Sequence, residues 1–112
     1  MDLDAKKSLY DILKAAREIA DYTHGLDFRG FQGNGMVKAA VERKFEIIGE
    51  ALHRMEKTEA PALNRISDYR RIIDFRNIIS HGYDVVDVEI VWEAITDYLP
   101  VLTEEVEALL AQ

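Results

Sequence analysis

Cysteine is absent from the 112 residues of the chain. Its absence excludes disulfide bonds, metal sites built from thiolates and a cysteine nucleophile. Long apolar runs are missing too, because no uncharged stretch approaches the ~20 apolar residues that a membrane-spanning helix needs. Residues 1–4 also lack the basic start and apolar core of a signal peptide. We therefore expect a cytoplasmic protein with no membrane association.

Motifs for nucleotide and metal chemistry are scarce. Four of the six glycines lie from Gly25 to Gly35, but this segment lacks the Gly-Lys-Ser/Thr ending of a phosphate-binding loop, and no GxGxxG motif occurs. His24, His53 and His81 form neither an HExxH motif nor a pair four residues apart. The sequence therefore predicts no metal site and no cofactor. We expect His24 and His53 at helix ends or on the surface.

The charge of the chain is acidic overall but unevenly distributed. Lys and Arg total 14 and Asp and Glu total 21, a net charge of −7, which argues against a general nucleic-acid binder. Residues 84–112 contain eight acidic residues and no Lys or Arg, so residues 1–83 carry 14 basic against 13 acidic residues. Four arginines fall within residues 65–76. A polyanion can still bind on this arginine-rich side.

Helical periodicity dominates the chain. Apolar residues recur every three to four positions over residues 4–23, 34–57 and 64–80, and again from residue 87 toward the carboxyl end. A glycine-rich loop is expected over residues 25–35, with Asn34 capping the helix that follows. The length and a composition of 48% hydrophobic and 31% charged residues fit one globular domain over residues 1–112.

Pro100 falls inside the fourth helical segment. Its ring excludes a backbone hydrogen bond, so we expect a kink or interruption near residues 96–99. Strand signals are limited to the brief β-branched run at residues 85–88. Short connections between successive helices favour antiparallel neighbours. The sequence therefore predicts an all-α, antiparallel up-and-down four-helix bundle with a kinked C-terminal helix.

One segment concentrates polar side chains at the end of the third predicted helix, namely Arg76, Asn77, His81 and Tyr83. On an unbroken helix, residues five apart point about 140° away from each other. Arg76 and His81 can therefore converge only if the helix stops between them. Gly82 lies at the expected end position and offers such a stop.

A structural role is the alternative interpretation of this segment. Arg76 could pair with a core carboxylate, Glu46 or Glu50, while His81 only closes the helix. The two glutamates lie four residues apart on one helix face, and we expect them to hold Arg76 rather than to act in catalysis. Trp92 is expected in the core or in a dimer interface rather than as a platform for stacked bases.

The chain resembles the HEPN domain family, in particular the HepT-like toxins that are paired with minimal nucleotidyltransferase antitoxins. The R-x4-H-x-Y hallmark of these toxins is matched by Arg76, His81 and Tyr83. Residues 45–51 and 91–92 are further family-like stretches, and they stand in the family's order of helices. The likeness extends over nearly the whole chain.

The resemblance implies a metal-independent endoribonuclease, and the residues suit that chemistry. RNA cleavage requires a deprotonated 2′-hydroxyl, a protonated leaving 5′-oxygen and stabilised charge on the phosphorane. His81 can be the acid or the base because imidazole titrates near neutral pH, and Arg76 can hold two phosphate oxygens. Asn77 can orient the phosphate or the ribose, with Glu50 in support. One histidine cannot be both acid and base in one step, so we expect a homodimer with a shared cleft.

The resemblance also implies that the partner nucleotidyltransferase transfers AMP to Tyr83. The added phosphodiester would place bulk and negative charge where the RNA phosphate must bind, and Arg76 would pair with it instead. Two other functions stay open: a non-catalytic HEPN module that helps a nucleotidyltransferase bind its substrate, and a plain four-helix interaction protein. Loss of RNA cleavage on His81→Ala separates the ribonuclease from both, and nucleotide binding without cleavage favours the non-catalytic HEPN module.

Overall fold

Helices account for nearly all of the secondary structure. The computed structural model describes residues 1–80 and 87–112, and of residues 76–80 it describes only the backbone. Its α-helices are α1 (Leu3–Thr23), α2 (Phe28–Gln32), α3 (Gly35–Lys57), α4 (Tyr69–Ser80), α5 (Val88–Glu93) and α6 (Leu99–Leu110). A 3₁₀ helix, η1 (Pro61–Arg65), precedes α4, and a π-helical turn, η2 (Ala94–Tyr98), joins α5 to α6. These two described ranges contain no strand, and the all-α prediction is confirmed.

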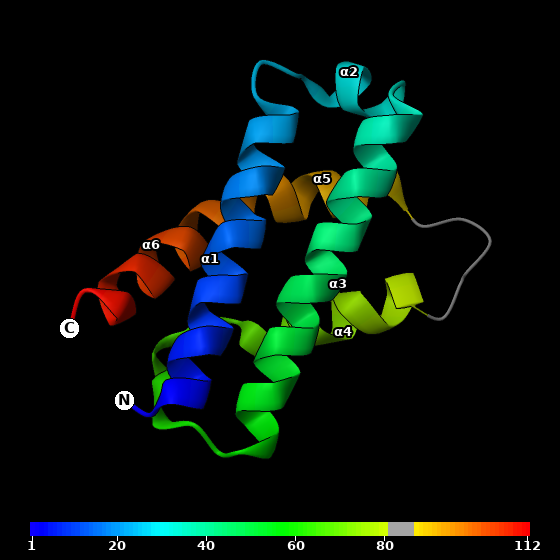
Figure 1. Ribbon diagram of the computed structural model, residues 1–112. Coiled ribbons are helices and arrows are strands. Elements are labelled where there is room, and N and C mark those ends of the chain that lie inside the picture. The colour runs from blue at the N-terminus through cyan, green and yellow to red at the C-terminus, as the bar shows by residue number, and fades with distance from the viewer. Residues whose placement is uncertain (81–86) are drawn as a thin grey trace.

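Helices α1 and α3 form an antiparallel pair at the centre of the fold, and α4 and the α5–α6 segment cross this pair at an angle (Figure 1). Helix α4 packs on α3, and α6 packs on α1. The four predicted helical segments are thus present, with α5, η2 and α6 together forming the fourth. None of the helices in the described ranges is both long and apolar enough to cross a membrane.

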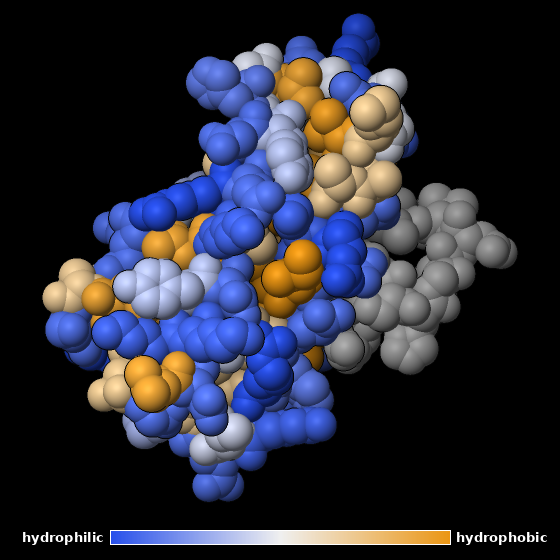
Figure 2. Space-filling view, viewed as in Figure 1, coloured by the Kyte–Doolittle hydropathy of each residue, from blue (hydrophilic) through white to orange (hydrophobic). Residues whose placement is uncertain are grey.

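The core lies between α1, α3 and α6. Its fully buried side chains include Leu9, Ile12 and Ile19 of α1, Val41, Ile48 and Leu52 of α3, and Val106 of α6. Burial of one such side chain stabilises the fold by about 1.5–3 kcal/mol. The face that α1 and α3 turn outward is mostly hydrophilic, with small separate apolar patches (Figure 2).

Side-chain caps fix the starts of helices, those of α3 and α5 among them. Asn34 accepts a hydrogen bond from the backbone N–H of Val37 at 3.0 Å, so the predicted cap is confirmed. Asp87 accepts from the backbone N–H of Glu89 at 2.9 Å at the start of α5. Such caps satisfy amide groups that have no partner inside the helix.

The loop predicted over residues 25–35 is wrong in part, because it contains helix α2. The Asp27 side chain accepts a hydrogen bond from the backbone N–H of Gly30 at 2.8 Å. Phe31 is fully buried. A local cap and one buried apolar side chain therefore stabilise a helix of five residues that includes Gly30.

The third predicted helix, over residues 64–80, is wrong at its start. η1 ends at Arg65, and Asp68 has a left-handed φ of 55°, so the α-helix begins only at Tyr69. Ser67 is tied to Glu105 of α6: its backbone N–H donates to Oε1 at 3.0 Å and its hydroxyl to Oε2 at 2.8 Å. The break before α4 is thus hydrogen-bonded to α6.

The interruption predicted ahead of Pro100 is confirmed. It takes the form of η2, where the backbone N–H of Leu99 donates to the carbonyl of Ala94, five residues earlier. Pro100 lies in the first turn of α6. Its missing N–H costs little there, because first-turn amides have no partner inside a helix.

Candidate functional site

The predicted motif begins on α4. Arg76 and Asn77 belong to this helix by their backbone, which is described through residue 80. His81 and Tyr83 lie outside the described residues. The convergence of Arg76 and His81 therefore stays a prediction.

The part of α4 just before Arg76 is anchored in the core. Ile72, Ile73 and Phe75 are buried. The Phe75 ring meets the Phe45 ring of α3 edge to face, with 5.1 Å between centroids and an interplanar angle of 90°. This geometry is one of the two favoured arrangements of aromatic rings. The backbone that carries Arg76 is thus held by its preceding turn.

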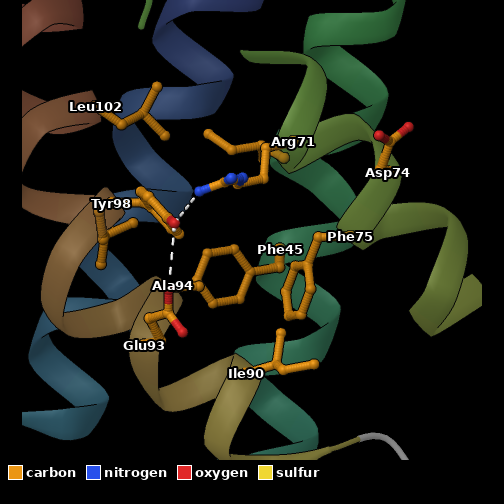
Figure 3. A pocket seen from close by; sticks show the side chains of 11 residues that line it. Phe45, Arg71, Asp74, Phe75, Ile90, Glu93, Ala94, Tyr98 and Leu102 are labelled. Carbon is orange, nitrogen blue, oxygen red and sulfur yellow. Dashed lines mark hydrogen bonds between the residues drawn. The ribbon is translucent and has the colours of Figure 1, made fainter. Parts of the chain in front are cut away.

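A cavity of about 320 Å³ lies beside this turn, between α4 and the α5–η2–α6 segment (Figure 3). Its interior is apolar and is formed by buried side chains: Phe45, Ile72, Phe75, Ala94, Leu99 and Leu102. Its rim is exposed and mostly polar: Arg71, Asp74, Ile90 and Glu93, with Tyr98 half-buried. An apolar interior with a few polar groups at the mouth is typical of small-molecule sites.

The polar groups at the rim are joined in a network. Arg71 of α4 donates a hydrogen bond to the Tyr98 hydroxyl. The same hydroxyl donates to Oε1 of Glu93 at 3.2 Å. The guanidinium carbon of Arg71 also lies 5.2 Å from the centre of the Tyr98 ring, a cation–π distance. The network links α4 to α5 and η2 across the cavity mouth (Figure 3).

The acidic pair predicted to support the motif lies on α3. Glu46 and Glu50 have their carboxylate oxygens 3.4 and 3.8 Å from Nη1 of Arg43. Arg43 is therefore their cation within the described residues, and their predicted contact with Arg76 stays a prediction. No three His, Asp or Glu side chains of residues 1–80 and 87–112 come together as a possible metal site.

Trp92 packs against other side chains of the fold, which agrees with the core position that was one of its two predicted locations. Its ring is half-buried and lies 5.3 Å from Phe31 and 6.4 Å from Phe28, both of α2. His24 lies exposed at the end of α1, as predicted. His53 is half-buried on α3, close to the end of that helix. Within the described residues, these positions indicate a structural role for Trp92, His24 and His53.

The cavity was not predicted from the sequence. Its walls come from three separate segments, at residue 45, residues 71–75 and residues 90–102. Periodicity identifies which residues of a helix face inward, but not which other helix they face. The one local signal is a run of aromatic and charged residues, Tyr69 to Arg76, immediately before the motif.

Comparison with known proteins identifies the family. Residues 12–109 match the family described as "Ribonuclease HepT-like". "Putative RNase MJ1380" of Methanocaldococcus jannaschii is 32% identical over 104 residues, which cover 93% of this chain and 94% of that protein. "Probable ribonuclease HepT" of Thermococcus cleftensis is 30% identical over 104 residues, with 93% and 94% covered. No solved structure gives a significant match. With this extent of similarity, the chain belongs to the HepT-like ribonuclease family.

Proposed function

We propose that this protein is a metal-independent endoribonuclease and the toxin of a toxin–antitoxin pair. The observation that carries the proposal is the R-x4-H-x-Y motif of Arg76, His81 and Tyr83, which falls within the residues that match the ribonuclease family. The names of the relatives agree with the activity. The packing of Phe75 on Phe45 supports it further, because it fixes the helix turn from which the motif starts.

The proposed reaction is transfer of the phosphodiester to the ribose 2′-hydroxyl. The 2′-oxygen attacks the phosphorus, the bond to the 5′-oxygen breaks, and the products are a 2′,3′-cyclic phosphate and a 5′-hydroxyl. His81 takes or supplies a proton, because its imidazole changes charge near neutral pH. Arg76 stabilises the negative charge on the phosphorane oxygens, and Asn77 orients the phosphate or ribose, with Glu50 in support.

The proposed active form is a homodimer. One proton must leave the 2′-hydroxyl while another reaches the 5′-oxygen, and one imidazole cannot do both in a single step. A twofold axis that brings two α4 ends together supplies one histidine from each chain. The exposed arginines Arg65 and Arg70 lie just before and on α4, where they would meet the RNA backbone.

The proposed antitoxin is a minimal nucleotidyltransferase that adds AMP to Tyr83. Tyr83 is two residues after His81 in the sequence. A phosphodiester attached there would compete with the RNA phosphate for Arg76, because guanidinium groups bind phosphate oxygens in pairs. Modification would thus silence the ribonuclease.

The experiment is a cleavage assay on purified variants. Arg76→Ala and His81→Ala should each abolish RNA cleavage and leave the helical circular dichroism signal unchanged. Arg29→Ala and His24→Ala are matched controls, because both residues are exposed and neither belongs to the motif. Arg29 lies in α2, and His24 follows the last residue of α1. Cleavage that survives His81→Ala refutes the proposed mechanism, and nucleotide binding by a wild type that does not cleave indicates a non-catalytic module instead.

A further inference from the structure

The cavity beside α4 contains none of the motif residues and has no role in the chemistry above. It nevertheless combines an apolar interior, aromatic walls and an open polar mouth. Its volume of about 320 Å³ is at the small end of the range for ligand pockets. These features fit a small flat group whose faces contact the apolar walls and whose polar edge faces the mouth.

The walls favour an aromatic ring. Phe45 and Phe75 are 2% and 7% exposed, and their perpendicular rings form one side of the cavity (Figure 3). The Tyr98 ring forms part of the mouth, with the Arg71 guanidinium carbon 5.2 Å from its centre. Aromatic rings and guanidinium planes are the surfaces on which unpaired RNA bases stack.

The mouth favours a neutral ring that carries N–H donors. Arg71 is its one cation among the described residues, against the carboxylates of Asp74 and Glu93, so a phosphate group is disfavoured inside. Glu93 uses Oε1 for Tyr98, and its other oxygen points away from that bond (Figure 3). Each carboxylate oxygen can accept further hydrogen bonds.

The position of the cavity ties it to the motif. Ile72 and Phe75 line it from α4, and Arg76 is the next residue of the same helix. From Phe75 to Ser80, where the described part of α4 ends, the helix advances about 7.5 Å. A nucleotide whose phosphate binds at the motif therefore has its base, or that of a neighbouring nucleotide, within reach of the cavity.

We propose that this cavity is a nucleobase subsite of the RNA substrate, beside the cleaved bond, and that it selects guanine. Guanine presents two adjacent N–H donors, N1–H and the 2-amino group, to the Glu93 carboxylate. Uracil presents one N–H between two carbonyl oxygens, which the carboxylate repels. The subsite rests on the proposed ribonuclease function, but its ligand can be tested separately.

The test compares wild type with Glu93→Gln. Mapping of cleavage sites in a random RNA pool should show a guanine preference that falls about tenfold in the variant, the discrimination of one good bidentate contact. Isothermal titration of the full chain should show GMP binding more tightly than UMP, with the difference lost in Glu93→Gln. Glu89→Gln is the matched control, because Glu89 is an exposed glutamate of the same helix and does not line the cavity. Thermal melting confirms that both variants are folded.

Each outcome separates the subsite from the ribonuclease function. RNA cleavage with the same base distribution in wild type and Glu93→Gln overturns the subsite and leaves the ribonuclease intact. Absence of cleavage in wild type overturns the ribonuclease, and the GMP titration then decides the subsite alone. A change of sedimentation on Glu93→Gln, without any GMP binding, means that a second copy of the chain fills the cavity, and it overturns the proposal.

Discussion

Arg71 is an exposed residue of α4 whose hydrogen bond connects this helix to η2 and α5 across the cavity mouth. Its guanidinium carbon lies 5.2 Å from the centre of the Tyr98 ring, and the guanidinium donates to the Tyr98 hydroxyl, which in turn donates to Glu93. Arg76 follows five residues later on the same helix. In the proposed site the two arginines therefore have different roles. Arg71 forms part of the mouth of the base subsite, and Arg76 binds phosphate.

The role proposed for Tyr83 predicts a variant that keeps its activity and loses its regulation. Tyr83→Phe should cleave RNA like the wild type, because the proposed reaction uses no phenol as acid or base. After co-expression with the cognate nucleotidyltransferase, the wild type should gain the mass of one or more AMP units and lose activity, whereas Tyr83→Phe should gain none and stay active. Intact-protein mass spectrometry measures the difference. Equal mass gains in both proteins would refute modification at Tyr83.

At the scale of single elements, helices with local end signals were predictable and the irregular joints were not. The start of α3 followed from Asn34, whose cap is a short-range interaction. The break ahead of α4 depends on the left-handed conformation of Asp68 and on the hydrogen bonds of Ser67 to Glu105, 38 residues away. No local sequence pattern predicts either feature. Pro100 predicted an interruption, but its π-helical form is set by packing on both sides.

The bond between Ser67 and Glu105 should stabilise the junction before α4. Glu105→Ala removes both hydrogen bonds and should lower the free energy of unfolding by about 1 kcal/mol. Glu104→Ala is the matched control, because Glu104 is an exposed neighbour on α6. Urea unfolding followed by circular dichroism measures both. Equal stabilities of the two variants would show that the bond contributes nothing to the fold.

At the scale of the whole molecule, the acidic C-terminal segment is partly used in holding the fold together. Glu105 accepts from Ser67, and Glu107 pairs with Arg17 of α1 at 3.3 Å. The sequence predicted the charge asymmetry but not these partners, since pairing depends on which helices are neighbours. The motif was recognisable because its spacing is short, whereas the cavity required the packing of α3, α4 and the α5–η2–α6 segment.

The proposed dimer predicts cooperation between chains. The protein should sediment as a dimer at micromolar concentration. Mixing wild type with inactive His81→Ala should lower activity more than dilution alone, because each cleft would draw one histidine from each chain. A stable, fully active monomer in analytical ultracentrifugation, or activity that falls only in proportion to the added variant, would contradict shared sites.

The most direct test of the ribonuclease is a time course of RNA cleavage in excess chelator, with wild type and His81→Ala side by side. Wild type should cleave at the same rate with and without EDTA, should leave 2′,3′-cyclic phosphate ends, and should not cut an oligonucleotide with a 2′-deoxy ribose at the cleavage site. His81→Ala should be inactive under every condition. Activity that disappears in EDTA and returns with a divalent cation would contradict the proposed mechanism.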